Sequence, residues 1–249
     1  MTTDPAATRA AQAASFDAAA DVYERARPGY PDEVVDWLLA SRPREVLDLG
    51  AGTGKLTRSL VDRVATVHAV DPSPNMLAQL GAALPEVRTA VGTAEAVPLP
   101  DAAVEAVLVA QAWHWVDPER ALPEVRRVLR PGGVLGLVWN VRDESVPWVA
   151  RLTEIIHGSA AERFIAEGRG MPDGVGDVER LTWSWQRPVD RQGLLDLVAS
   201  RSYMITAPPE VRADVLAQVS DLLDTHPDLA GRDRWELPYR TEAFRVALT

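Results

Sequence analysis

The chain has 249 residues, 47% of them hydrophobic, which is enough for the core of one large α/β domain or two small ones. It contains no cysteine, which excludes disulfides, thiolate metal sites and cysteine nucleophiles. The formal net charge of −10 disfavours a nucleic acid substrate, because proteins that grip a phosphate backbone normally carry a basic face.

The N-terminal segment, residues 1–20, is alanine-rich and polar. It lacks the basic start and apolar centre of a signal peptide, so we expect none. The chain has no uninterrupted apolar run long enough for a transmembrane helix, so we expect no membrane span. We therefore expect a cytoplasmic protein.

Five short apolar runs, separated by helical patterns, predict the strands of a parallel sheet covered on both faces. These runs span residues 46–49, 66–70, 87–91, 104–110 and 134–139. Ser73 is expected to cap the helix after the second strand, with Pro74 at its first position. Asp117 and Pro118 open a later helix, and the Pro-Gly-Gly sequence at 131–133 is expected to stop it.

The second half of the chain continues with helical patterns at 146–156, 194–199 and 209–223. Hydrophobic residues alternate with polar ones at 181–186 and 235–239, as in half-buried strands. Pro238 within the second of these runs predicts an edge strand. We therefore predict an α/β fold with a doubly wound, mostly parallel seven-stranded sheet, helices on both faces and a C-terminal helical insertion near 187–231.

The most informative segment is the turn after the first strand, where Asp48 is followed by three glycines at alternate positions. Such glycines let the backbone come close to a ligand that any Cβ would block. The spacing excludes a phosphate-binding P-loop, because the first glycine of that motif falls on Leu49 and Leu56 follows Lys55. It also departs from the dinucleotide fingerprint, since the third glycine comes one residue early.

The pattern Asp48-x-Gly50-x-Gly52-x-Gly54 resembles motif I of the class I S-adenosylmethionine-dependent methyltransferases, whose fold is Rossmann-like. The resemblance implies that this turn, with Ala51 and Thr53, lies under the methionine part of the cofactor. Asp71 ends the second strand and can accept hydrogen bonds from both hydroxyls of a ribose. S-adenosylmethionine and NAD both carry such a ribose, so Asp71 fits either of them.

The segment after the third strand, 92–101, resembles the adenine-binding loop of the same family. The resemblance places Thr93, Ala94 and Glu95 against the adenine. Thr93 stands where many members have an acid, so its hydroxyl or the Ala94 backbone amide would replace a carboxylate contact. Glu95 is equally consistent with an acidic surface residue that contacts no ligand.

The sequence Gln111-Ala112-Trp113-His114-Trp115 follows the fourth strand, at the edge where open α/β sheets bind ligands. It resembles a stretch of the type 11 methyltransferases, in a subgroup that includes trans-aconitate methyltransferase-like proteins. His114, the candidate catalytic residue, would then lie near the transferable methyl group, either as a general base or as a residue that shapes the pocket. Trp113 and Trp115 either line the sulfonium by cation–π attraction or belong to the core.

An N-terminal stretch, 16–31, resembles a lid of the same subgroup, in which Tyr23 and Arg27 face the cofactor or the substrate. A packed entry helix that ends at Pro28 is the alternative. The resemblance as a whole assigns these residues to the cofactor site: Tyr23, Arg27, Asp48, Gly50, Ala51, Gly52, Thr53, Gly54, Asp71, Pro72, Met76, Thr93, Ala94, Glu95, Gln111 and Trp113.

We therefore expect one methyltransferase domain over 1–249, with lid helices at 1–43, a cofactor-binding core at 44–140 and a C-terminal half at 141–249. It would transfer a methyl group from S-adenosylmethionine to a small molecule, without a metal. A non-catalytic S-adenosylmethionine-binding regulator, an RNA methyltransferase and an NAD-dependent oxidoreductase remain as alternatives. The methyl acceptor and the oligomeric state are not readable from the sequence.

Overall fold

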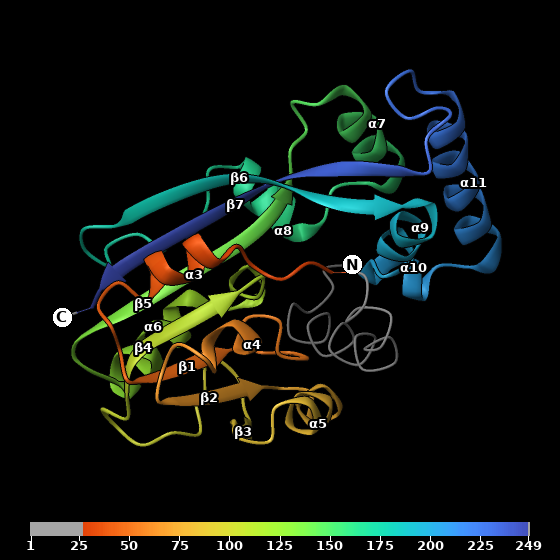
Figure 1. Cartoon of the computed structure of the whole chain (residues 1–249). Coiled ribbons are helices and arrows are strands. Elements are labelled where there is room, and N and C mark those ends of the chain that lie inside the picture. Colours follow the sequence, from red (N-terminus) through yellow and green to blue (C-terminus); the bar gives the residue numbers. More distant parts are fainter. Residues whose placement is uncertain (1–26, 249) are drawn as a thin grey trace, which may run out of the picture. The chain divides into compact units, whose positions relative to one another are not determined.

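The computed structural model describes residues 27–248, whose strands form a seven-stranded sheet in the order β3-β2-β1-β4-β5-β7-β6 (Figure 1). The strands are β1 Glu45–Leu49, β2 Thr66–Asp71, β3 Arg88–Val91, β4 Val104–Ala110, β5 Leu129–Arg142, β6 Glu179–Asp190 and β7 Arg234–Ala247. The helices are α3 Asp32–Leu38, α4 Thr57–Leu60, α5 Pro74–Ala83, η1 Trp113–Trp115, α6 Pro118–Val128, α7 Pro147–Ile156, α8 Ala160–Ala166, α9 Arg191–Ala199, α10 Ser202–Thr206 and α11 Pro209–Thr225. Among these described helices, none has the length and apolar character needed to cross a membrane.

The strands β3, β2, β1, β4 and β5 pair in parallel, with β1 at the centre. The first four predicted strands are confirmed to within one residue at either end. Runs of branched apolar residues that are buried on both faces of a sheet are easily recognised, because nothing polar interrupts them. The parallel pairing brings the carboxyl ends of β1, β2 and β4 to one edge of the sheet.

The strand β5 begins at Leu129, earlier than the predicted start at 134. The Pro-Gly-Gly sequence at 131–133 therefore lies within the strand and does not stop the preceding helix, which already ends at Val128. Gly132 has a φ of +75°, and the register against β4 shifts between Val104 and Ala106. The pairing of β5 with β4 thus continues past the turn-forming residues, with a local irregularity in its register.

The strand β7 runs antiparallel between β5 and β6, so the sheet is mixed (Figure 1). The amide of Leu248 donates to Gly133 O at 2.9 Å, and the amide of Asp143 donates to Pro238 O at 3.0 Å, so the β7 numbers fall as the β5 numbers rise. The predictions of a mostly parallel sheet and of an edge strand at Pro238 are both wrong. Proline lacks an N–H, but its carbonyl still accepts a hydrogen bond from the neighbouring strand. Here this bond is sufficient for Pro238 to lie in a strand that has neighbours on both sides.

Two compact units make up the described chain. The glycine-turn unit comprises residues 29–140, 164–183 and 241–248, and the helical unit comprises residues 27–28, 141–163 and 184–240. The division of the sequence into a lid, a core and a C-terminal half of one domain stays a prediction.

The glycine-turn unit contains the parallel strands and the predicted helix caps. The Ser73 hydroxyl accepts from the Met76 amide at 3.1 Å with Pro74 first in α5, which confirms the predicted cap. Asp117 likewise accepts from the Glu119 amide at the start of α6. Aliphatic side chains from α3, β1, α4, β2, α5 and β4 form its core, among them Val34, Val35, Leu38, Val46, Leu60, Ala69, Leu80 and Leu108.

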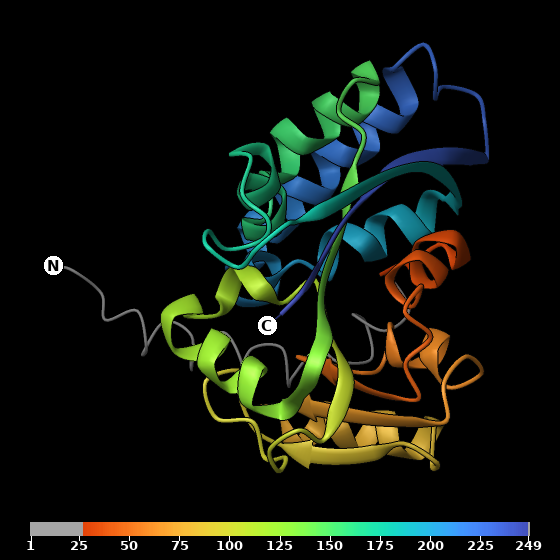
Figure 2. The ribbon, with the colours of Figure 1, turned by 90° about the vertical axis from the view of Figure 1, so that its left-hand side faces the viewer.

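The helical unit has its own core between α7, α9, α10 and α11. The helices α7 and α11 lie side by side in both ribbon views (Figures 1 and 2). The buried residues here include Trp148, Leu152, Ile156, Leu194, Val198, Met204, Val219, Leu223 and Leu237. The helices α9, α10 and α11 all lie between β6 and β7 in the chain, in the segment where a helical insertion was predicted.

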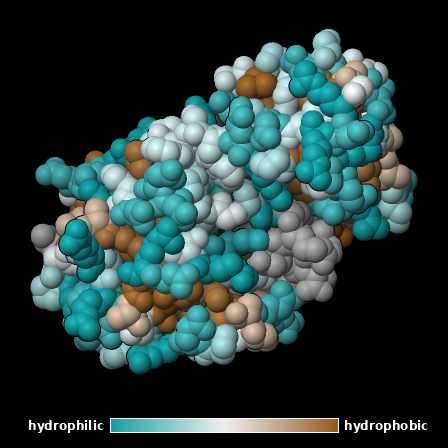
Figure 3. All heavy atoms as spheres, in the orientation of Figure 1, coloured by the Kyte–Doolittle hydropathy of each residue, from teal (hydrophilic) through white to brown (hydrophobic). Residues whose placement is uncertain are grey.

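The face of the molecule in Figure 3 is mostly hydrophilic or neutral, with smaller hydrophobic groups between. The large hydrophobic side chains that the described residues expose are Val91, Val178 and Val211. They lie far apart in the sequence, and single exposed apolar residues of this kind are normal on the surface of a folded protein.

Candidate functional site

The turn after β1 is held in a conformation that only glycine adopts without strain. The amides of Gly50 and Ala51 both donate to Val70 O, at 2.8 and 3.1 Å. Gly50, Gly52 and Gly54 have φ values of +77°, +55° and +90°. A Cβ on Gly50 would lie 2.7 Å from the Cβ of Ala112, so the turn also packs closely against the segment that follows β4.

Asp48 is fully buried beneath this turn. Its Oδ2 accepts from the Thr57 hydroxyl at 2.6 Å, whereas its Oδ1 has no hydrogen-bond partner among the described residues. Burial, with a smaller contribution from the nearby Asp71 carboxylate, raises the pKa of Asp48 to about 7, against the opposing hydrogen bonds from Thr57. A positive charge placed beside Oδ1 would compensate a carboxylate that is otherwise costly to bury.

Asp71 links the end of β2 to the glycine turn. Its Oδ2 accepts from the Gly52 amide at 2.9 Å, and its Oδ1 accepts from the Ser73 amide at 2.8 Å. A carboxylate has about four lone-pair sites, so it can accept several hydrogen bonds at once. Met76 is buried beside the turn, with its Sδ 3.6 Å from where a Cβ on Gly52 would lie, while Pro72 is exposed.

The loop after β3 closes on itself at Thr93 and Ala96, whose backbones form an isolated antiparallel bridge. Thr93 is exposed, and Ala94 is buried. The Oε1 of Glu95 accepts from the Asp117 amide at 3.0 Å. Glu95 therefore ties this loop to the start of α6, which gives it a structural use whether or not it also contacts a ligand.

The segment after β4 is anchored by Asn140, a residue that the sequence reasoning missed. The side-chain amide of Gln111, a residue with a φ of +55°, donates to Asn140 O at 2.8 Å. The Asn140 side chain in turn donates to Gly29 O at 2.9 Å and accepts from the Thr241 hydroxyl at 2.7 Å. These partners are distant in sequence, so only the fold could show that they fix the segment that carries His114.

His114 lies among aromatic side chains. Its Nδ1 accepts from the indole N–H of Trp139 at 3.3 Å, and its ring centroid is 4.6 Å from that of Trp115 and 6.2 Å from that of Phe164. Desolvation, aided by the positive charge of Arg169, lowers the pKa of His114 to about 3. The imidazole is therefore neutral at pH 7. Since Nδ1 accepts, the ring proton resides on Nε2, which makes that nitrogen a donor.

We expect the His114 imidazole to remain neutral from pH 8 down to pH 5. The folded pKa lies below the unfolded value of 6.5, so the stability that this group contributes is present above pH 6.5 and is lost as the pH falls toward 3. An NMR titration of the imidazole carbon signals measures this directly. A His114 midpoint above pH 6 would contradict the assignment.

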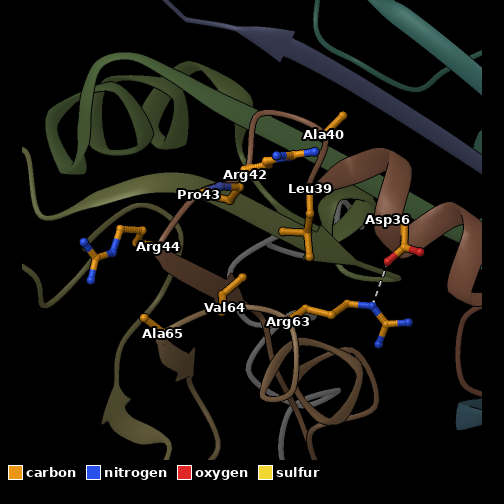
Figure 4. Close-up of a pocket in the computed structure, with 9 residues that line it drawn as sticks. All are labelled: Asp36, Leu39, Ala40, Arg42, Pro43, Arg44, Arg63, Val64 and Ala65. Atoms are coloured by element: carbon orange, nitrogen blue, oxygen red, sulfur yellow. Dashed lines mark hydrogen bonds and ion pairs between the residues drawn. The ribbon is translucent and has the colours of Figure 1, made fainter.

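A surface hollow of about 660 Å³ lies at the other end of the strands (Figure 4). Its lining residues precede β1 and β2, namely Asp36, Leu39, Ala40, Arg42, Pro43, Arg44, Arg63, Val64 and Ala65. Arg63 donates to both Asp36 and Asp32, at 2.8 and 2.7 Å, so its charge is already paired. Ligands of open α/β sheets bind at the carboxyl ends of the strands, and this hollow lies at the amino ends.

Most of the predicted site residues converge on the carboxyl ends of β1, β2, β3 and β4. These are Asp48, Gly50, Ala51, Gly52, Thr53, Gly54, Asp71, Pro72, Met76, Thr93, Ala94, Glu95, Gln111, Trp113 and His114. Trp113 is buried, as its core alternative requires. Arg27 belongs to the helical unit, and Tyr23 lies outside the described residues.

Comparison with known proteins gives consistent matches. A family model described as a methyltransferase domain matches residues 47–137. An uncharacterized methyltransferase of Mycobacterium tuberculosis is 54% identical over 94% of this chain and 96% of its own length. An uncharacterized methyltransferase-like protein of Schizosaccharomyces pombe is 36% identical over 89% of this chain and 91% of its own.

A solved structure from Anaeromyxobacter dehalogenans, assigned as a type II methyltransferase, shares the fold. It superimposes with a TM-score of 0.71 at 27% sequence identity, and the match covers 89% of this chain and 97% of the other. The segment that the family model covers includes the glycine turn, the loop after β3 and the His114 segment.

Proposed function

Because the chain belongs to the S-adenosylmethionine-dependent methyltransferases, we propose that it transfers the methyl group of that cofactor to a small organic molecule. The observation that carries the site assignment is the turn of three left-handed glycines above the buried Asp48, whose Oδ1 has no partner within the described chain. A Cβ at Gly50 would lie 2.7 Å from the Cβ of Ala112, so the turn keeps this packing only with glycine, and a cation would satisfy the carboxylate.

Different residues around the turn hold different parts of the cofactor. S-adenosylmethionine, when bound, supplies a methyl group on a cationic sulfur that is already activated for transfer. Asp48 and the close backbone approach that the glycine turn allows hold the methionine part. Asp71 accepts from the ribose hydroxyls, and the loop carrying Thr93, Ala94 and Glu95 packs on the adenine. Positioning of the two reactants then supplies most of the acceleration.

His114 acts in this scheme as a positioning residue. A neutral imidazole whose conjugate acid has a pKa of about 3 is too weak a base to take a proton efficiently at pH 7. Its Nε2–H can instead donate a hydrogen bond, while Nδ1 is fixed by Trp139 at 3.3 Å. The general-base alternative therefore has less support than the pocket-shaping one.

Tyr23 and Arg27 belong to a lid, and the helices α9, α10 and α11 are an insertion that serves acceptor selection. The chain falls within the subgroup of type 11 methyltransferases that includes trans-aconitate methyltransferase-like proteins. These proposals are supported by the sequence segments 16–31 and 111–115, which resemble that subgroup.

Isothermal titration calorimetry with S-adenosylmethionine, S-adenosylhomocysteine and NAD tests the cofactor. We expect both adenosyl compounds to bind and NAD not to bind, and binding of NAD alone would overturn the assignment. Product formation with a panel of small acceptors separates an enzyme from a non-catalytic regulator. A salt-dependent shift of a tRNA in a gel would instead favour an RNA methyltransferase.

We expect Asp71→Ala to weaken S-adenosylmethionine binding by about 1–3 kcal/mol, roughly 5- to 150-fold in Kd, since charged hydrogen bonds to the ribose are lost. The Gly52 amide also loses its acceptor, so the turn loosens. Calorimetry at pH 8 measures the effect. The exposed Asp62→Ala is the matched control in the same unit, and equal Kd values for the two variants would remove Asp71 from the site.

A further inference from the structure

The segment expected to contact the adenine, residues 92–101, is held in place by α6. It contains no helix or strand apart from one isolated bridge. Glu95, near its start, accepts from the amide of Asp117, the residue that caps α6. Glu124 and Arg127, in the last two turns of α6, hold its other end. All of these residues belong to the glycine-turn unit, so the conformation of the segment depends on contacts within that unit.

The guanidinium of Arg127 uses all five of its N–H donors within the chain. Its Nε and Nη2 donate to the two carboxylate oxygens of Glu124, both at 2.8 Å. Its Nη1 donates to Leu99 O at 2.8 Å and to Asp101 Oδ1 at 2.9 Å. The second hydrogen of Nη2 is donated to Val97 O at 2.9 Å. Because the five donors of a guanidinium lie in one rigid plane, they fix the positions of these acceptors relative to one another.

The Glu124–Arg127 pair also fixes two backbone amides. Glu124 Oε2 accepts from the Val97 amide at 2.9 Å, and Arg127 O accepts from the Ala102 amide at 2.8 Å. Val97 is therefore held at both its N–H and its carbonyl. The hydrogen bonds between the two side chains lower the pKa of Glu124 and raise the pKa of Arg127, so both are charged at pH 7.

The Glu124–Arg127 pair adds little to the stability of the fold. The side chains of Arg127 and Glu124 are 31% and 24% exposed, and that of Asp101 is 81% exposed. Ion pairs that are this accessible to water contribute little to the free energy of unfolding. The pair therefore determines the shape of the segment more than the stability of the fold.

The two ends of the segment are in contact with each other. Gly92, at the start, packs so closely on Pro98 that a Cβ on Gly92 would lie 2.5 Å from Pro98 Cδ. The backbones of Thr93 and Ala96 bond to each other at 3.4 and 3.2 Å. Between them, the Ala94 amide donates to no acceptor in the part of the chain that the structure describes. A change at the end held by α6 is therefore passed on to the turn that carries this amide.

We propose that Arg127 is a positioning residue for the cofactor, and that by fixing the segment it gives the site its preference for adenine, which rests on the proposed function. All five donors of Arg127 are used within the chain, so its effect reaches the cofactor through the segment. An amide held in a fixed position, such as that of Ala94, can donate to N1 of adenine. Hypoxanthine carries a hydrogen on N1, so it would meet that donor with another donor, and a buried donor left unpaired discriminates strongly between ligands.

Calorimetric titration of the full chain with S-adenosylhomocysteine and S-inosylhomocysteine, which differ only in the base, tests the proposal. We expect the wild type to prefer S-adenosylhomocysteine. Arg127→Gln should weaken S-adenosylhomocysteine about tenfold, as expected for one lost hydrogen bond, and S-inosylhomocysteine less than about twofold. Equal weakening of the two compounds, or weakening of neither, would overturn the proposal.

Arg63→Gln is the matched control in the same unit. Arg63 is 26% exposed and, like Arg127, donates to two acids, Asp32 and Asp36, and to a backbone carbonyl, that of Ser59 at 2.8 Å. It lies at the opposite end of the strands, so we expect both compounds to bind Arg63→Gln as they bind the wild type. A loss of base preference in Arg63→Gln equal to that in Arg127→Gln would show a general loosening of the unit and would overturn the proposal.

Arg127→Lys separates the charge from the geometry, and it also serves if Arg127→Gln does not fold. One ammonium nitrogen cannot reach all the acceptors that the planar guanidinium spans, so we expect the base preference to stay below that of the wild type. Full recovery of the preference in Arg127→Lys would show that the charge alone is sufficient, which would overturn the positioning role.

Hydrogen exchange of the Val97 amide in the cofactor-free protein measures the effect of Arg127 on the segment itself. We expect faster exchange in Arg127→Gln and wild-type exchange in Arg63→Gln. Unchanged exchange in Arg127→Gln would overturn the proposal whatever the cofactor. If the wild type binds S-adenosylhomocysteine and Arg127→Gln keeps the wild-type Kd and preference, the proposal alone fails and the proposed function stands. If the wild type binds neither compound, the proposed function fails, and the proposal fails with it.

Discussion

Asp48→Asn will make the protein more stable at pH 8 and a weaker binder of S-adenosylmethionine. Raising the pKa of a buried carboxyl from 3.8 to about 7 corresponds to roughly 4 kcal/mol of unfavourable charge burial at high pH. The new amide leaves a buried N–H₂ without a partner, which costs about 1–3 kcal/mol. We therefore expect a net gain of about 2 kcal/mol in the free energy of unfolding at pH 8.

The pH dependence of stability provides the sharper test. The folded pKa of Asp48 lies above its unfolded value, so the folded state binds more protons between pH 4 and 7. Wild-type stability thus falls, relative to Asp48→Asn, as the pH rises from about 4 to about 7, and the difference is constant above that. Urea unfolding at several pH values measures it, with the exposed Asp101→Asn as control. Parallel pH profiles for wild type and Asp48→Asn would contradict the assignment.

Cofactor binding should change in the opposite direction. A cationic cofactor favours the ionised carboxylate, so wild-type affinity for S-adenosylmethionine rises with pH up to about 7 and then levels off. Asp48→Asn should lose at least tenfold in affinity at pH 8 and lose the pH dependence, since a charged hydrogen bond is worth about 1.5–3 kcal/mol. Asp48 thus lowers the stability of the cofactor-free wild-type protein and raises its affinity for the cofactor.

Gly50→Ala is the second change with a large expected effect. A residue with a Cβ at φ +77° is strained by about 1–2 kcal/mol, and the new Cβ would approach Ala112 Cβ to 2.7 Å. We expect a loss of about 2–4 kcal/mol in stability and a loss of S-adenosylmethionine binding that calorimetry can measure.

Ala112→Gly supplies the matched control for that change. Combined with Gly50→Ala, it removes the contact between the two Cβ atoms and leaves the backbone strain. The double variant should therefore recover part of the stability of the single variant, with a coupling energy of at least about 0.5 kcal/mol in a double-mutant cycle. Strictly additive effects would show that Gly50 does not pack against Ala112.

The part of the fold that the sequence predicts is the part fixed by local chemistry. The strands at 46–49 and 104–110 are uninterrupted apolar runs, and the Ser73 cap with Pro74 depends on neighbouring residues alone. The placement of β7 depends on pairing with β5, which is about a hundred residues distant in the chain. The edge-strand prediction at Pro238 fails because proline lacks an N–H but keeps a carbonyl, which here accepts from the Asp143 amide.

The functional site likewise has some features set by local sequence and others set by residues that are distant in the chain. The glycine spacing identifies the cofactor class because each glycine is required by its own backbone geometry. Three features depend on residues brought together by folding. They are the burial of Asp48 Oδ1 without a partner among residues 27–248, the Trp139–His114 hydrogen bond and the Glu162 carboxylate shared by two arginines. Arg201 and Tyr203 form no readable substrate-recognition pattern in the sequence, because their neighbour Arg142 lies on another element.

The central claim is that the glycine turn binds S-adenosylmethionine, and backbone ¹⁵N–¹H NMR during titration with S-adenosylhomocysteine tests it most directly. We expect the amides of Gly50, Gly52 and Gly54 to shift most, followed by Asp71 and Ala94, while the amides of Arg42 and Val64 at the opposite end of the strands do not move. Saturable binding that leaves the three glycine amides unshifted would contradict the claim.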